Sequence, residues 1–200
     1  MNERMIRFII YSIIILLFFK DYNTLRLFIA IRFSPRFDRA LRELTDELAA
    51  QARFCRKTPP ENFHLTLAFI GESERADDIR ALMEPGLGPA FTLATDALGR
   101  FARSGGDVCW LGIERSQPLT ELQAELYRRL TRAGFDLEKR AFKPHLTLLR
   151  QAVFPPEFDL KAYSRDLPRL HERVDRVSLM SSDLSGKRPV YRELYGRELE

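Results

Sequence analysis

NFHLTLAFIG at residues 62–71 and FKPHLTLLR at residues 142–150 contain the same tetrapeptide, His-Leu-Thr-Leu. Both stretches are rich in apolar and β-branched or aromatic residues, which predicts two buried strands. Because side chains on a strand alternate between faces, His64 and Thr66 share one face, and so do His145 and Thr147. The opposite faces are expected to pack into the core through Phe63, Leu65, Leu67 and Phe69 in the first copy and Leu146 and Leu148 in the second.

Each copy closes a similar stretch of chain. Residues 27–31 predict a strand, and Ser34-Pro35 is typical of a helix start. Residues 108–113 predict another strand, and Ser116 is a plausible cap for a helix that ends at Gly134. Phe28 precedes His64 by 36 residues and Trp110 precedes His145 by 35. We interpret this as an internal repeat.

The other elements are weaker predictions: helices at 76–83 and near 160–165, and strands at 91–101, 173–180 and 190–195, the last two joined by a turn at Ser185-Gly186. Two strand–helix–strand units that face each other form an α+β fold. The predicted fold is therefore bilobal and duplicated, with two antiparallel-type sheets facing a central cleft and helices outside.

Two histidines that meet across such a cleft suit the cleavage of a phosphodiester. One imidazole can take a proton from the attacking oxygen and the other can protonate the leaving oxygen, because the ordinary histidine pKa is near 6.5. Thr66 and Thr147 could hydrogen-bond the phosphate oxygens. A cation is also needed, and Lys143 and Arg150 are the nearest candidates in sequence. Strict alternation puts Lys143 on the His145 face and Arg150 opposite, unless the strand ends or bulges after Leu148.

Other kinds of site fit less well. A single histidine on an apolar strand is more often a structural residue, but core packing does not require His-x-Thr twice. His171 has no partner motif and is expected at the surface. No metal site is expected, because each motif supplies one histidine and the nearest carboxylates, Glu61 and Glu72, fall outside the motif faces. No G-x-S-x-G nucleophile motif is present.

The composition is that of a folded protein of one domain or two small lobes. It has 200 residues, of which 45% are hydrophobic, and a formal charge of +4. The mild positive charge suits an anionic substrate such as RNA. Cys55 and Cys109 are too few for a zinc framework, and we expect two reduced thiols in a cytosolic protein.

Residues 1–24 differ from the rest, since Arg4 and Arg7 precede the apolar run at 8–19. The run is short for a membrane-spanning helix, and no A-x-A-like site supports a cleaved signal peptide. A membrane-surface anchor is a third interpretation. We favour a fourth, in which translation begins near Leu25 and residues 25–200 form the domain.

The segments RLFIAI, PPENFHLTLAFIGE and FKPHLTLLR, in that order, resemble the 2H phosphoesterase superfamily and, within it, the RNA 2′,3′-cyclic phosphodiesterase (2′-5′ RNA ligase) family. The resemblance covers residue 25 to the C-terminus. It implies a bilobal α+β fold that opens 2′,3′-cyclic phosphates to 2′-phosphates without metal or cofactor, in some members with reversible 2′-5′ joining. It also implies that His64 protonates the leaving 3′ oxygen, His145 activates water, and Thr66, Thr147 and Arg150 hold the phosphate.

We therefore expect an enzyme acting on cyclic phosphate ends of RNA. The alternatives are a phosphodiesterase for small cyclic nucleotides or 2′-5′ oligonucleotides, and a protein that binds RNA ends without turnover. We further expect a cytoplasmic monomer without an obligate protein partner.

Overall fold

The computed structural model describes residues 24–186 and 188–200, so the predicted extension at 1–24 lies outside the described residues except for Thr24. Within this part of the chain, no helix is long and apolar enough to span a membrane. The elements of the first half, in chain order, are β1 (Leu25–Ile31), α2 (Pro35–Ala50), β2 (Phe54–Lys57), the 3₁₀ turn η1 (Pro60–Asn62), β3 (Leu65–Ser73), α3 (Ala76–Met83) and β4 (Phe91–Phe101). The second half contains β5 (Asp107–Ile113), α4 (Gln117–Arg132), β6 (His145–Val153), α5 (Leu160–Arg165), β7 (His171–Val174), β8 (Arg176–Asp183) and β9 (Val190–Glu198).

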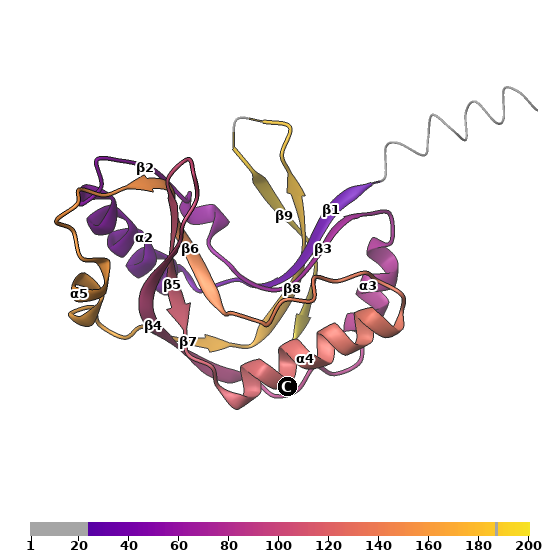
Figure 1. Cartoon of the computed structure of the whole chain (residues 1–200). Coiled ribbons are helices and arrows are strands. Elements are labelled where there is room, and N and C mark those ends of the chain that lie inside the picture. Colours follow the sequence, from indigo (N-terminus) through magenta and orange to yellow (C-terminus); the bar gives the residue numbers. More distant parts are fainter. Residues whose placement is uncertain (1–23, 187) are drawn as a thin grey trace, which may run out of the picture.

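Two antiparallel sheets build the two lobes, with strand orders β3-β1-β8-β9 and β2-β6-β5-β4-β7. Each motif strand pairs with the first strand of its own repeat. Strand β3, which follows His64, pairs with β1, and β6, which begins with His145, pairs with β5. The repeat is therefore visible in the topology, and the predicted α+β fold with two facing sheets is confirmed (Figure 1).

Helices α2 and α4 begin in the same way. Ser34 Oγ accepts a hydrogen bond from the Phe37 amide, and Ser116 Oγ accepts one from the Leu119 amide. Each helix has a proline in its first turn, where the missing N–H costs nothing. One face of each helix is buried, through Phe37, Leu41, Thr45 and Leu48 in α2 and through Leu119, Leu122, Leu126 and Leu130 in α4.

Each long helix packs on the sheet of the other lobe. Helix α2 follows β1 but contacts β2 and β6, whereas α4 follows β5 and contacts mainly β3 and α3, with a smaller contact to β4. Figure 1 shows α2 beside β2 and α4 below β3 and α3. Because each helix packs on the other lobe, the two lobes share one continuous cluster of buried residues. This cluster includes Ile29 and Leu65 from one sheet and Leu111 and Leu148 from the other. A shared core of this kind holds the two sheets in a defined relation.

Two sequence predictions are corrected. The stretch at 173–180 is divided at Asp175 between β7, which pairs with β4, and β8, which pairs with β1 and β9. The chain between α2 and the Pro59-Pro60 pair contains an additional strand, β2. Because β2 is short, lies at a sheet edge and exposes Phe54, Arg56 and Lys57, it lacks the alternating apolar pattern that identifies a half-buried strand.

Candidate active site

His64 and His145 occupy matching places at the starts of their strands. His64 lies between η1 and β3, and His145 is the first residue of β6. His64 Nδ1 is 2.8 Å from the carbonyl oxygen of Asn62, and His145 Nδ1 is 2.7 Å from that of Lys143. A carbonyl oxygen can only accept, so each Nδ1 carries the proton and donates it. Each Nε2 is therefore the nitrogen left to exchange a proton with a substrate.

Both histidines line one cleft of about 1510 Å³. Thr66, Thr147 and Arg150 line the same cleft, so the structure brings together all five residues that the sequence singled out. The threonines are half-buried, and their neighbours Leu65, Leu67, Leu146 and Leu148 are buried behind them. The motif strands thus present a polar face to the cleft and an apolar face to the core.

Arg150 reaches the cleft because β6 bulges. Thr147 pairs with Trp110 and Leu149 pairs with Cys109, so Leu148 is an extra residue on β6. Leu148 and Leu149 are both fully buried, and the alternation after the bulge is reversed. The geometric condition under which Arg150 can face the histidines is therefore met.

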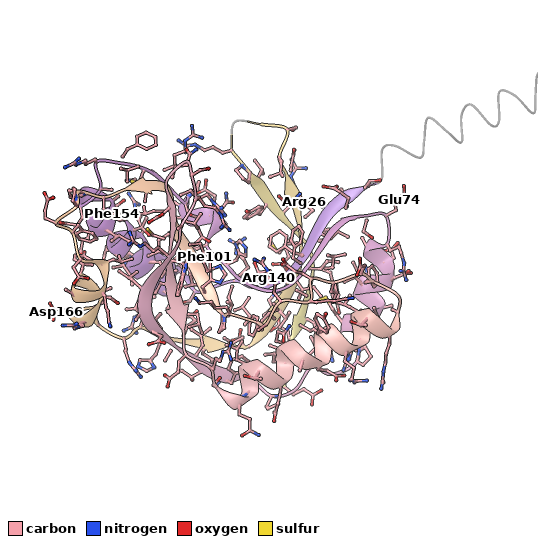
Figure 2. All side chains as sticks on the ribbon, in the orientation of Figure 1. Arg26, Glu74, Phe101, Arg140, Phe154 and Asp166 are labelled. Carbon is pink, nitrogen blue, oxygen red and sulfur yellow. The ribbon has the colours of Figure 1, made fainter. Side chains whose placement is uncertain are left out.

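An equivalent bulge in β3 corrects the prediction for Phe69. Thr66 pairs with Ala30 and Ala68 with Ile29, which leaves Leu67 as the extra residue. Phe69 therefore lines the cleft and is 40% exposed, although strict alternation had placed it in the core. The guanidinium of Arg26 lies over its ring, 4.8 Å from the centroid. Figure 2 labels Arg26 beside β1.

Lys143, the other predicted cation, is not among the residues that line the cleft. Its ammonium lies 4.3 Å from the centroid of the Trp110 ring and 5.2 Å from that of Phe101. Both distances are within the range of a cation–π contact. Lys143 therefore affects His145 through its charge and its backbone carbonyl, from outside the cleft.

Aromatic rings support each imidazole. Phe28 and Tyr191 lie 5.0 and 5.2 Å from the His64 ring, the latter edge-on. Phe101, labelled near the middle of Figure 2, and Trp110 lie 5.3 and 5.8 Å from His145. Ring contacts and the Nδ1 hydrogen bond together restrict each imidazole to one orientation.

The pKa of each histidine is lowered from its ordinary value of 6.5. Burial is the main cause for both, and the hydrogen bond to the backbone carbonyl partly opposes it. Positive charges lower the pKa values further. Arg32, Arg150 and His145 act on His64, and Lys143, Arg140 and Arg150 act on His145. The lowered pKa values therefore favour neutral imidazoles, and an anion bound between them would favour the charged forms.

Several cleft residues were missed from the sequence, among them Tyr191 on β9 and Arg56 on β2. Their signal was weak: Arg56 is part of a short basic stretch before Pro59-Pro60, and Tyr191 follows a turn. Glu61 also lines the cleft, because it belongs to η1 and not to a strand. Glu72 instead pairs with Arg26, and His171 is exposed on β7.

Cys55 lines the cleft, whereas Cys109 does not. Cys55 and Cys109 are both free, and Cys109 is fully buried. Residues 24–186 and 188–200 contain no group of three or more His, Cys, Asp or Glu side chains placed to hold a metal ion.

Known proteins resemble this chain over most of its length. Residues 33–186 match the model of the 2′-5′ RNA ligase superfamily. The RNA 2′,3′-cyclic phosphodiesterase of Thermotoga maritima is 31% identical over 88% of this chain and 96% of its own length. The protein of the same name from Archaeoglobus fulgidus is 30% identical over 85% and 98%.

Solved structures agree with these relatives. The crystal structure of E. coli LigT complexed with 3′-AMP has a TM-score of 0.70 and 29% identity, and the match covers 88% of this chain and 98% of that one. With two histidines in one cleft, two repeated lobes and this match over residues 33–186, the chain belongs to the 2′-5′ RNA ligase superfamily of 2H phosphoesterases.

Proposed function

We propose that this protein hydrolyses the 2′,3′-cyclic phosphate at RNA ends and leaves a 2′-phosphomonoester. The observation that carries the proposal is the matched pair of imidazoles, each with Nδ1 bonded to a carbonyl and Nε2 left for proton transfer in one cleft. The relatives named RNA 2′,3′-cyclic phosphodiesterase, from bacteria and archaea, support the substrate class.

In the proposed reaction, His145 Nε2 takes a proton from water, whose oxygen attacks phosphorus. The bond from phosphorus to the ribose 3′ oxygen breaks, and protonated His64 donates a proton to that oxygen. Thr66 and Thr147 hydrogen-bond the non-bridging oxygens, and the Arg150 guanidinium offsets the negative charge that develops there. The imidazoles exchange protonation states in one turnover, and the solvent restores them.

Other substrates fit the same chemistry. Attack by the 5′ hydroxyl of a second RNA in place of water, with loss of the same 3′ oxygen, would join the two ends through a 2′-5′ bond, which is the reverse of cleavage at such a bond. Small cyclic nucleotides and 2′-5′ oligonucleotides are alternatives, and a structure of E. coli LigT with 3′-AMP shows a mononucleotide bound to a relative. RNA-end binding without turnover is disfavoured because both histidines and both threonines are present. The cytoplasmic location and the monomeric state stay predictions.

The test is hydrolysis of a nucleoside 2′,3′-cyclic phosphate in the presence of EDTA. The wild type should release a 2′-phosphate, and His64→Ala and His145→Ala should each lose at least about 10²-fold, the contribution expected of one proton-transfer group. His171→Ala is the matched control, since His171 is exposed on β7 away from the cleft lining. An inactive wild type, or activity that survives either motif substitution, would contradict the proposal.

A further inference from the structure

We propose that Arg56 forms a second phosphate site, which binds the phosphodiester on the 5′ side of the nucleotide whose cyclic phosphate is cleaved. The inference rests on the proposed function and adds to it. A site of this kind would make the enzyme select polynucleotide ends over free cyclic nucleotides.

The first observation is the strand register. Strands β2 and β6 are antiparallel, with Arg56 opposite Arg150 and Lys57 opposite Leu149. Residues directly opposite in an antiparallel pair have Cβ atoms roughly 4.5–5.5 Å apart and project from the same face of the sheet. Arg56 therefore lies beside the arginine that we assign to the cyclic phosphate.

The second observation identifies the face. Lys57 Nζ lies 2.8 Å from Asp46 Oδ1 on α2, so the ammonium of Lys57 is held by a carboxylate within the cleft lining. The residue opposite Lys57, Leu149, is fully buried. Because neighbours on a strand alternate, Arg56 lies on the face opposite to that of Leu149, which is the face of Arg150, and both arginines line the cleft.

The third observation is charge. Like charges directly opposite each other on a sheet are destabilising. Within residues 24–186 and 188–200, no carboxylate forms an ion pair or hydrogen bond with Arg56 or Arg150. Three other cations of the cleft do pair with carboxylates, namely Arg26 with Glu72, and Arg42 and Lys57 with Asp46. The repulsion between Arg56 and Arg150 is thus not offset by a carboxylate in this part of the chain. A polyanion such as RNA would offset it, because it carries successive negative charges.

The position of β2 assigns an order to the two phosphates. Strand β2 is the edge of the sheet order β2-β6-β5-β4-β7, so Arg56 lies one strand beyond Arg150. His145, Thr147 and Arg150 all belong to β6, so the reacting phosphate is expected to lie beside that strand. A chain that extends from this phosphate across the edge of the sheet brings its next phosphate to Arg56, where a guanidinium can form two charge-assisted hydrogen bonds.

The experiment compares two substrates that share the reacting group. One is adenosine 2′,3′-cyclic phosphate, and the other is a trinucleotide that ends in the same cyclic adenosine. The wild type should show the higher kcat/KM on the trinucleotide. Arg56→Gln should lose about tenfold on the trinucleotide, the value of one charged hydrogen-bonding group, and should be unchanged on the nucleoside. Arg56→Lys, which keeps the charge, should recover part of the loss.

Arg53→Gln is the matched control, because Arg53 is an exposed arginine next to the same strand but outside the cleft lining. It should behave as wild type on both substrates. In addition, the slope of log(kcat/KM) against log[salt] on the trinucleotide should decrease by about 0.7 in Arg56→Gln, as expected for one lost phosphate contact to a single strand.

An equal loss on both substrates, or equal losses in Arg56→Gln and Arg53→Gln, would overturn the inference. If the wild type cleaves neither substrate, the proposed function fails. A binding measurement then tests the second phosphate site separately. A fluorescent trinucleotide with a 3′-phosphate should then bind Arg56→Gln about tenfold more weakly than wild type or Arg53→Gln. Equal Kd values for the three proteins would overturn it.

Discussion

Phe69 and Arg150 occupy equivalent positions in the two lobes, each three residues after a motif threonine and each brought to the cleft face by a bulge at the intervening leucine. Without these bulges both side chains would point away from the histidines. The same backbone irregularity thus supplies an aromatic ring to one side of the cleft and a guanidinium to the other. The pseudo-symmetric site therefore has two different ends. The Phe69 end is suited to a nucleobase, and the Arg150 end is suited to a phosphate.

Substitution of Arg150 tests the phosphate end. Arg150→Ala should lower kcat/KM on a cyclic phosphate by about 10²–10³-fold, since a positioned donor to the developing charge is removed. Arg150→Lys should fall between this variant and the wild type, because lysine keeps the charge but not the bidentate geometry. Competitive inhibition by inorganic phosphate should weaken in parallel. Wild-type kinetics in Arg150→Ala would remove Arg150 from the site.

Substitution of Phe69 tests the end of the cleft that we expect to bind the nucleobase. An exposed ring in a cleft of this kind can stack a nucleobase, which is worth about 1–3 kcal/mol. Phe69→Ala should therefore raise KM about tenfold, whereas Phe69→Tyr should stay near wild type. Steady-state kinetics on a nucleoside cyclic phosphate measure the effect. A fall in kcat at constant KM would indicate a packing role instead.

The pH dependence should distinguish the two histidines. Burial and positive neighbours lower the pKa of both, so the optimum of kcat/KM should lie on the acidic side of the ordinary histidine pKa of 6.5. Lys143→Gln removes a positive charge that acts on His145 and should raise the pKa of His145 while leaving the carbonyl at position 143. A base must be deprotonated, so the acidic limb of the profile should move to higher pH.

The control for this experiment is Lys139→Gln, a lysine of the same loop whose charge is not among the main causes of the lowered His145 pKa. Histidine NMR titrations would follow the pKa directly. Movement of the basic limb in Lys143→Gln would assign His145 as the acid and reverse the two roles.

The packing of Trp110 should matter for rate. Gly99 pairs with Trp110 across β4 and β5, and a methyl group at position 99 would overlap the Trp110 ring. Gly99→Ala should displace that ring against His145 and lower kcat about tenfold or more, because small misplacements of a catalytic group are costly. Gly105→Ala is the control, since nothing lies within 4 Å of a Cβ there. Equal kcat in both variants would show that the Trp110 contact does not position His145.

The fold also contains a carboxyl group that opposes stability at neutral pH. Burial raises the pKa of Asp38, in the first turn of α2, to about 6, with Glu172 adding to the effect and Arg32 opposing it. The folded protein therefore binds more protons than the unfolded chain between the unfolded pKa near 3.8 and about pH 6, and the free energy of unfolding decreases as the pH rises through this window.

Asp38→Asn should remove that dependence. Each pKa unit is worth about 1.4 kcal/mol, so the variant should be more stable at pH 7 by about 1–3 kcal/mol after solvent screening. Below about pH 4 the two proteins should have equal stability. Denaturant unfolding at both pH values measures the difference, and a gain that persists at low pH would point to a cause other than charge.

Much of the architecture was predictable because it is encoded locally. Ser34-Pro35 and Ser116 mark helix starts through capping bonds within three residues, and the helices at 76–83 and 160–165 and the strand at 91–101 were predicted with the bounds that the structure shows. The short strand β2 was not predictable, since an edge strand with exposed charges buries too little to leave a pattern.

The sequence by itself determined the duplicated fold and the residues with the chemistry, because His-x-Thr on one face of an apolar strand is a local pattern that occurs twice. Only the tertiary structure decided which further side chains join them. The bulges at Leu67 and Leu148, the pairing of Arg56 with Arg150 and the packing of each helix on the other lobe depend on strands far apart in the chain. A one-residue shift in pairing moves a side chain to the opposite face, and local periodicity does not record such a shift.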